Sequence, residues 1–404
     1  MPPDPASRTV RRATRAVYAV FILSGFAFAS WASRIPSIRD ALDLSPRTLG
    51  LVLLAIAVGS VVSMPLAGVV VGRLGTARTV AVMALVAAAG LATAGLGYPV
   101  GVAVVLVGLF ALGVGNGTWD VAMNVEGSAV EQELRRAIMP RFHAGFSVGT
   151  VAGALIGAGM VALGVSATVH LVGVAAFVAI AVPLAVRDFL PDVDARPEDA
   201  ERRNPLTAWT EPRTVLIGLF VFAAAFTEGT GNDWLAVATI DGYGAPAALG
   251  SLTFALFLAA MTLGRWFGPA ALDRYGRVPT LRVLSLTALV GLALVVWGGS
   301  LPVAMAGAIL WGLGTALGFP VGMSAASDDP HRAAGRVSVV ATVGYVAFLA
   351  GPPLIGFLAD DAGTLNALTA TGGLVALGLL VSGALREPAA PVAEAAGAPA
   401  PSRP

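Results

Sequence analysis

Apolar blocks of about 20 residues recur along the whole chain, and they constrain its fold more than any other feature. A block of that length is what an α-helix needs to cross the roughly 30 Å hydrocarbon core of a bilayer. Charged residues make up only 12% of the chain, against about 25% in a typical soluble domain. The sequence therefore predicts an all-α integral membrane protein.

Charged residues, prolines and glycines divide the apolar stretches into twelve candidate spans. The first six cover 17–33, 48–71, 79–97, 101–125, 142–163 and 167–186. The last six cover 214–238, 249–271, 280–298, 302–325, 337–359 and 366–385. This division predicts four parts, namely an N-terminal six-helix bundle in 1–186, a linker in 187–213, a C-terminal six-helix bundle in 214–386 and a disordered tail in 387–404.

The arginines are distributed unevenly between the two sides of the predicted membrane region. Only Arg34, Arg39 and Arg47 fall in loops opposite the N-terminus, and Arg265 falls inside a span. The other arginines lie in or beside loops on the side of the N-terminus and the linker. Because basic residues accumulate in short cytoplasmic loops, we expect both termini to be cytoplasmic and the protein to lie in the cytoplasmic (inner) membrane.

Composition also excludes several classes of function. The net charge is +1 and the arginines are scattered, so no basic face for nucleic acid is expected. There is no cysteine, and the three histidines, at 143, 170 and 331, are far apart in sequence. Disulfides, thiolate metal sites and the catalytic constellation of an enzyme are therefore not expected, and no cofactor is predicted.

Short segments recur at about half the chain length. Arg73-Leu74-Gly75 returns 201 residues later as Arg274-Tyr275-Gly276, and Gly113-x-Gly115 returns 199 residues later as Gly312-x-Gly314. Repeats of this kind, in the same orientation, occur in membrane transporters. They predict two six-helix bundles related by a pseudo-two-fold axis.

The fourth span carries polar residues at helical spacing. Asn116, Asp120 and Asn124 are four residues apart, so each lies only about 40° around the helix from the previous one. Acidic residues inside spans are rare, face the interior or a water-filled cavity, and mark ion or substrate pathways. This face is predicted to line a substrate site with Asp120 as its proton carrier; the alternative is a hydrogen-bonded packing contact.

A second polar group lies late in the seventh span, where Glu228, Asn232 and Asp233 are interspersed with glycines. Glycines among acids favour a discontinuous helix whose exposed backbone coordinates a solute. Glu228 and Asn232 would share one face of it. Asp233 belongs either to the same site or to the outer vestibule.

Three further residues are candidates for the site. Trp31 and Trp234 occupy comparable places in spans 1 and 7, where they could stack on a sugar-like solute or anchor the helix at the membrane interface. His143, at the start of span 5, could titrate near neutral pH or serve as a structural hydrogen-bonding residue.

Six plus six spans with a charged central loop resemble the major facilitator superfamily, and the loop after span 8 carries that family's signature as Asp273-Arg274-Tyr275-Gly276-Arg277. After span 2 the signature is degraded, because Gly72 precedes Arg73 where the family has Asp. The resemblance implies gating roles for Arg73, Asp273, Arg274 and Arg277. It also implies that Asp273 stabilises an outward-open state from near the positive N-terminal end of span 5.

Closer similarities indicate a subgroup. The segments 115–124, 143–149 and 232–234 resemble bacterial permeases grouped with the membrane protein MosC, and 120–124 is more loosely similar to a helix-4 segment of fucose–proton symporters. The resemblance implies a monomeric secondary transporter that moves a small polar, sugar-like solute across the lipid bilayer by proton-coupled alternating access. Efflux of amphipathic compounds and a non-transporting membrane sensor are the alternatives.

Overall fold

The computed structural model describes residues 5–134, 138–191, 205–329 and 332–387. Within these ranges every regular element is helical, and twelve segments are long and apolar enough to cross a membrane, one for each predicted span. The all-α prediction is therefore confirmed. Most of the predicted linker and nearly all of the predicted tail lie outside the described residues, and the proposed domain boundaries stay a prediction.

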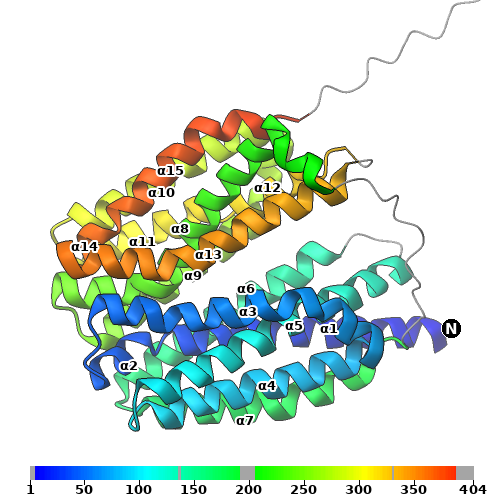
Figure 1. Ribbon diagram of the computed structural model, residues 1–404, viewed down its shortest axis with the longest axis horizontal. Coiled ribbons are helices and arrows are strands. Elements are labelled where there is room, and N and C mark those ends of the chain that lie inside the picture. The colour runs from blue at the N-terminus through cyan, green and yellow to red at the C-terminus, as the bar shows by residue number, and fades with distance from the viewer. Residues whose placement is uncertain (1–4, 135–137, 192–204, 330–331, 388–404) are drawn as a thin grey trace, which may run out of the picture.

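The first half of the chain supplies seven α-helices and a short 3₁₀ helix after them. These are α1 (Pro5–Ala32), α2 (Ile35–Ala41), α3 (Pro46–Leu74), α4 (Thr76–Gly97), α5 (Val102–Leu134), α6 (Met139–Ala162), α7 (Ala167–Ala185) and η1 (Val186–Asp188). They form the lower bundle in Figure 1.

The second half forms the upper bundle in Figure 1. Its helices are η2 (Pro205–Thr210), α8 (Pro212–Tyr243), α9 (Ala247–Tyr275), α10 (Arg277–Trp297), α11 (Leu301–Thr315), α12 (Gly318–Ala326), α13 (Ala333–Ala362), α14 (Thr364–Ala367), α15 (Thr369–Val381) and η3 (Ser382–Leu385). The two bundles meet mainly where α3 packs on α13 and α6 packs on α9.

The repeated glycines make equivalent contacts in both bundles. A side chain at Gly113 would collide with the carbonyl oxygen of Ile56 in α3, and one at Gly312 would collide with that of Phe257 in α9. Gly75 and Gly276, which end α3 and α9, have the same backbone angles, φ 78° and ψ 168°. Only glycine adopts this conformation without strain. The sequence repeat therefore corresponds to a repeat in packing.

The seventh span is not broken, so the predicted discontinuity at 227–234 is wrong. α8 runs without interruption from Pro212 to Tyr243. In hydrocarbon no water replaces a lost backbone hydrogen bond, so a glycine inside a span stays helical unless something else removes its partner. Gly229 and Gly231 instead allow the rings of Phe348 and Phe257 to approach the helix closely.

The discontinuity lies in the tenth span, between the end of α11 at Thr315 and the start of α12 at Gly318. Pro320 has no backbone N–H, so it cannot donate to the carbonyl of Ala316 four residues earlier. The break therefore leaves the Ala316 carbonyl oxygen available to another donor.

Candidate functional site

Two adjoining cavities lie between the bundles. The inner one, which we call the chamber, has a volume of about 360 Å³ and takes its walls from both bundles. The outer one, which we call the mouth, has a volume of about 1090 Å³. It extends toward the end of the molecule where α3 and α9 finish, which we call the linker end. Both are lined by Asp120, Phe146, Arg265 and Phe319, so they form one continuous space.

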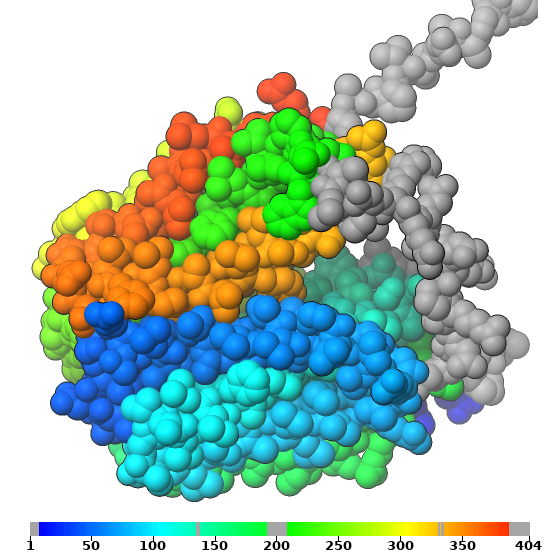
Figure 2. Space-filling model, viewed as in Figure 1, coloured from blue at the N-terminus to red at the C-terminus, as the bar shows by residue number. Residues whose placement is uncertain are grey.

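The bundles separate toward the linker end and stay together at the opposite, far end (Figure 2). At the far end Arg39 of α2 donates to Asp241 of α8 at 2.5 Å. The guanidinium of Arg47 lies 4.6 Å from the ring centre of Phe357. These contacts link the two bundles, and they close the far end of the cavity.

Backbone also meets backbone at this end. Gly50 of α3 lies against the carbonyl of Pro352, and Gly356 of α13 lies against the carbonyl of Pro46. A side chain at either glycine would force α3 and α13 apart. The two glycines therefore allow these helices, and with them the bundles, to approach closely at the far end.

The chamber brings together five of the polar residues singled out in the sequence. It is lined by Asn116, Asp120, Glu228, Asn232 and Asp233. Because these residues come from α5 and α8, the chamber unites the two polar groups from opposite bundles.

Asn124 has a different place, behind Asp120. Its Nδ2 donates to the backbone carbonyl of Asp120 at 2.8 Å and to the Asp120 Oδ1 at 3.3 Å. Asn124 therefore orients the carboxylate that faces the cavity and does not line the cavity wall itself.

Arg265 is the residue of the chamber that sequence reasoning missed. Its Nη2 donates to both carboxylate oxygens of Glu228 at 2.8 Å, and its Nε donates to the free carbonyl oxygen of Ala316 at 3.2 Å. Its position inside a span was visible in the sequence, and a charge there marks a functional site by default. The pairing of Arg265 with Glu228, which lies 37 residues earlier on another helix, was not visible in the sequence.

Trp31 and Trp234 are not brought to the cavity. Their side chains are 2% and 0% exposed within the packed helices, and neither lines the chamber or the mouth. In this conformation they can neither stack on a solute nor anchor the helices at the membrane surface.

The remaining predicted residues lie toward the linker end. His143 lines the mouth, with its ring edge-to-face against Phe21 at 5.2 Å. Arg277 also lines it and donates to Asp328 at 2.7 Å. Arg73 and Arg274 are exposed at the ends of α3 and α9.

Asp273 lines the mouth as an exposed residue and, among the described residues, makes no hydrogen bond or ion pair. The N-terminus of α6, where we expected Asp273 to act, is capped by Glu131, whose Oε2 accepts from the amides of Ile138 and Met139 at 2.9 and 2.7 Å. This conformation is open at the linker end, so the role of Asp273 in the other state stays a prediction.

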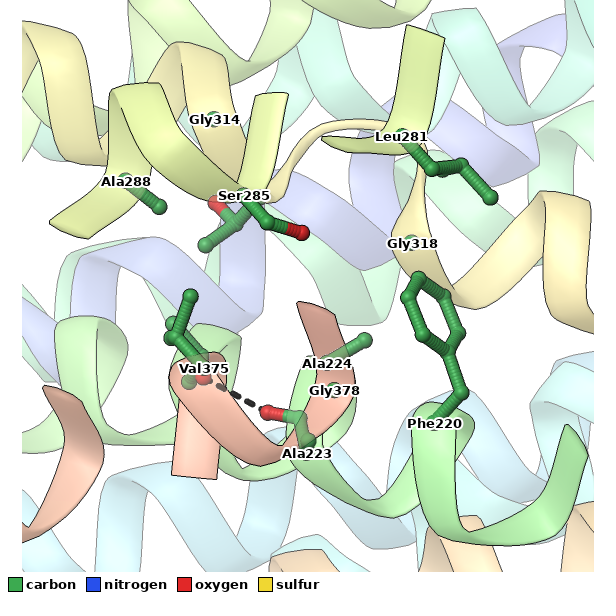
Figure 3. A pocket seen from close by; sticks show the side chains of 12 residues that line it. Phe220, Ala223, Ala224, Leu281, Ser285, Ala288, Gly314, Gly318, Val375 and Gly378 are labelled. Carbon is green, nitrogen blue, oxygen red and sulfur yellow. Dashed lines mark hydrogen bonds between the residues drawn. The ribbon is translucent and has the colours of Figure 1, made fainter. Parts of the chain in front are cut away.

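A smaller space lies inside the C-terminal bundle (Figure 3). It has a volume of about 30 Å³, and its lining residues, half of them alanine or glycine, come from α8, α10, α11, α12 and α15. The described residues around it include no charged side chain. It is a packing void, and the chamber remains the candidate site. The described residues also contain no group of histidines and acids that could hold a metal ion.

The sequence of the chain matches the family model described as Major Facilitator Superfamily over residues 17–345 and again over 234–404. It is 30% identical to an uncharacterized transporter, y4wD, of Sinorhizobium fredii, covering 86% of this chain and 91% of that protein. It is 27% identical to the membrane protein MosC of Rhizobium meliloti, covering 90% and 86% of the two chains.

Solved structures share the fold. The nucleoside transporter NupG superposes with a TM-score of 0.71 at 15% identity, covering 92% of this chain and 98% of that one. FucP, a fucose–proton symporter, superposes in its outward conformation with a TM-score of 0.66 at 15% identity, covering 93% of this chain and 98% of that one. The family match and the curated relatives together show that the protein is a transporter and not an enzyme, and that the chain belongs to the major facilitator superfamily.

Proposed function

We propose that this protein carries a small polar solute across the cytoplasmic membrane by alternating access, with protons as the coupling ion. The observation that supports the proposal is a chamber between the bundles that is lined by three acids and one arginine, closed at one end and continuous with an open mouth at the other. Acids in such a setting mark ion and substrate pathways.

Asp120 is the proton carrier in this proposal. It lines both the chamber and the mouth, and it makes no ion pair among the described residues. Glu228, by contrast, is bound to Arg265. A carboxylate without a counter-ion can take up and release a proton without first breaking an ion pair.

The test is transport in proteoliposomes with an internal pH-sensitive dye and a panel of sugars, polyols, nucleosides and amines. A solute whose addition drives proton movement across the membrane is the coupled substrate. Asp120→Asn should still exchange labelled for unlabelled substrate but should lose accumulation driven by a pH gradient. Asp360→Asn, an exposed acid at the far end of α13, is the matched control. Gradient-driven accumulation that persists in Asp120→Asn would move the coupling role to another residue.

The same proposal places the linker end and both termini in the cytoplasm. The uneven distribution of arginine supports this orientation. A reporter fused after residue 200 should be inaccessible to an external probe, and one fused after Gly242 should be accessible. Equal accessibility of both fusions would contradict the orientation.

Efflux of amphipathic compounds is the second candidate. It is favoured by the aromatic and methionine side chains in the chamber wall, which are Phe28, Met64, Phe146, Met261, Phe319 and Phe348. Adding amphipathic dyes to the same transport panel separates the two. Preference for the dyes over the polar solutes would support efflux.

A further inference from the structure

The wall of the chamber carries more acidic than basic side chains, and this imbalance concerns the chemistry of the solute. Its charged lining residues are Asp120, Glu228, Asp233 and Arg265. Three acids therefore face one base among the described residues of its wall. The inference below rests on the proposed transport function and specifies the class of solute.

Arg265 is already engaged in this arrangement. Its Nη2 contacts both oxygens of Glu228, and its Nε contacts the Ala316 carbonyl. The charge of Arg265 is thus matched by the charge of Glu228. Two acids, Asp120 and Asp233, remain without a basic partner among the described residues of the wall.

Asp233 and its neighbour Asn232 form the unpaired part of the wall. Asp233 makes no hydrogen bond or ion pair with any described residue, although it lies within the membrane-spanning helix α8. The Oδ1 of Asn232 is buried and has no hydrogen-bond partner in the described part of the chain. Buried acceptors and charges without partners are costly, so a native site of this kind implies a partner that is bound during function.

We propose that Asp233 and Asn232 form a subsite for an ammonium group, so that the solute is a hydroxylated primary or secondary amine. The ammonium supplies both things that the wall lacks, a positive charge for the Asp233 carboxylate and an N–H for the Asn232 Oδ1. Phe348 and Tyr345 line the same chamber, and aromatic faces also attract cations.

The proposal includes a proton balance. The proposal takes the Asp233 carboxyl, which has no basic partner among the described residues of the wall, to carry one proton in the empty chamber. When the ammonium binds, that proton leaves to solvent and the carboxylate pairs with the cation. Binding of an amine should therefore release one proton, and binding of the matching neutral solute should release none.

The experiment uses the purified full-length protein and solutes that share one skeleton, D-glucosamine, D-glucose and N-acetyl-D-glucosamine, with ethanolamine and ethylene glycol as a second pair. Thermal stabilisation gives the relative affinity. Proton release is recorded in weakly buffered solution. The wild-type protein should be half-maximally stabilised by the amine of a pair at about tenfold lower concentration than by its neutral counterpart.

Substitutions test whether the preference for amines and the proton release arise at Asp233 and Asn232. Asp233→Asn and Asn232→Ala should each reduce the preference for the amine, and Asp233→Asn should abolish proton release. Asp233→Glu, which keeps the charge, should retain both effects. Asp360→Asn, exposed and outside the chamber, is the matched control. Because Asn232→Ala and Asp233→Glu test the same subsite, the inference remains testable even if Asp233→Asn does not fold.

Equal stabilisation by amines and neutral solutes, or an amine preference that survives both Asp233→Asn and Asn232→Ala, would overturn the ammonium subsite. If neutral solutes are nevertheless transported in proteoliposomes with coupled proton movement, the proposed function stands and only the class of solute is wrong. If no solute of either kind moves, the proposed function itself fails.

Discussion

The guanidinium of Arg265 lies between the bundles with two kinds of partner, the carboxylate of Glu228 and a carbonyl freed by a helix break. The two side chains are 23% and 15% exposed, so the pair borders the cavity and is not fully dehydrated. Removing one member of such a pair leaves an uncompensated charge, which costs more stability than removing both.

We therefore predict that Glu228→Gln and Arg265→Gln each lower the unfolding free energy by about 1–3 kcal/mol, less than for a fully buried pair because the cavity admits water. The double variant should be more stable than either single one, yet should still fail to transport. Thermal unfolding in detergent and a proteoliposome assay measure the two properties. Additive losses in the double variant would show that the two charges do not interact.

Five of the polar residues of the site could be predicted because spacing on one helix and rarity in a membrane span are visible in the sequence. Asn116 and Asp120, for example, share a helix face whatever their neighbours are. The ion pair of Arg265 with Glu228 could not be predicted, since it joins two helices. The burial of Trp31 and Trp234 also depends on neighbouring helices, which is why neither of the two roles considered for them, stacking on a solute or anchoring at the interface, found support.

Among the elements, the break between α11 and α12 shows that neither glycine nor proline content alone decides whether a membrane-spanning helix is continuous. Glycines at 229 and 231 were expected to interrupt α8 but left it continuous, because every backbone partner there remained available. Pro320, which has no backbone N–H to donate, lies just after the break in the tenth span. Proline alone does not predict a discontinuity either, because Pro65, Pro183 and Pro269 lie inside continuous helices.

Pro320→Ala should restore a donor to the Ala316 carbonyl and so compete with the Nε of Arg265. We expect unchanged or higher thermal stability, since proline costs about 3 kcal/mol inside a helix, together with slower transport because Arg265 loses one of its anchors. Pro65→Ala, on an exposed face of α3, is the control and should leave transport unchanged. Full transport in Pro320→Ala would mean that the break is not needed.

The start of α8 is tied to α13 by a charged contact. Glu211 accepts from Arg336 at 2.6 Å, Thr214 at 3.0 Å and Arg332 at 3.3 Å. Although burial acts to raise the pKa of Glu211, the hydrogen bonds from Arg336 and Thr214 and the charges of Arg336 and Arg332 bring that pKa below its ordinary value.

A lowered pKa in the folded state means that this contact stabilises the protein at pH values above the ordinary pKa of 4.5 and is lost as the pH falls through the lower value. Glu211→Gln should therefore lower the unfolding free energy by about 0.5–1 kcal/mol at pH 7. The difference from the wild type should shrink progressively below pH 4.5. A difference that is constant over this pH range would contradict an ionic origin.

At the scale of the whole molecule, the two-bundle fold and the number of spans could be predicted because hydrophobic length and a repeat need no knowledge of tertiary contacts. The conformation, closed at the far end and open at the linker end, could not be predicted. It depends on contacts between the bundles, such as the contact of Arg39 with Asp241, which are 202 residues apart in the sequence. Neither residue was distinguishable from any other charge near a loop.

Arg39→Ala should weaken closure of the far end. A partly exposed ion pair contributes about 0.5–1 kcal/mol, so the ratio of far-end-open to far-end-closed molecules should rise about two- to fivefold. Ser60→Cys provides a single label in the chamber, since the chain has no cysteine of its own. An impermeant maleimide added from the far side should react faster with it in the Arg39→Ala background. Asp43→Asn, exposed on the same surface, should leave the rate unchanged.

The backbone contact of Gly50 with Pro352 has a mechanical consequence. It lies near one end of α3, about 36 Å from Leu74 and about 15 Å from Ser60 along the helix axis. If the bundles rotate about this contact by about 10°, the linker end of α3 moves about 6 Å while the chamber wall at Ser60 moves less than half as far. The contact then acts as the fulcrum of a lever with unequal arms. A methyl group added at Gly50 would change the distance that the linker end of α3 moves far more than it would change the shape of the chamber.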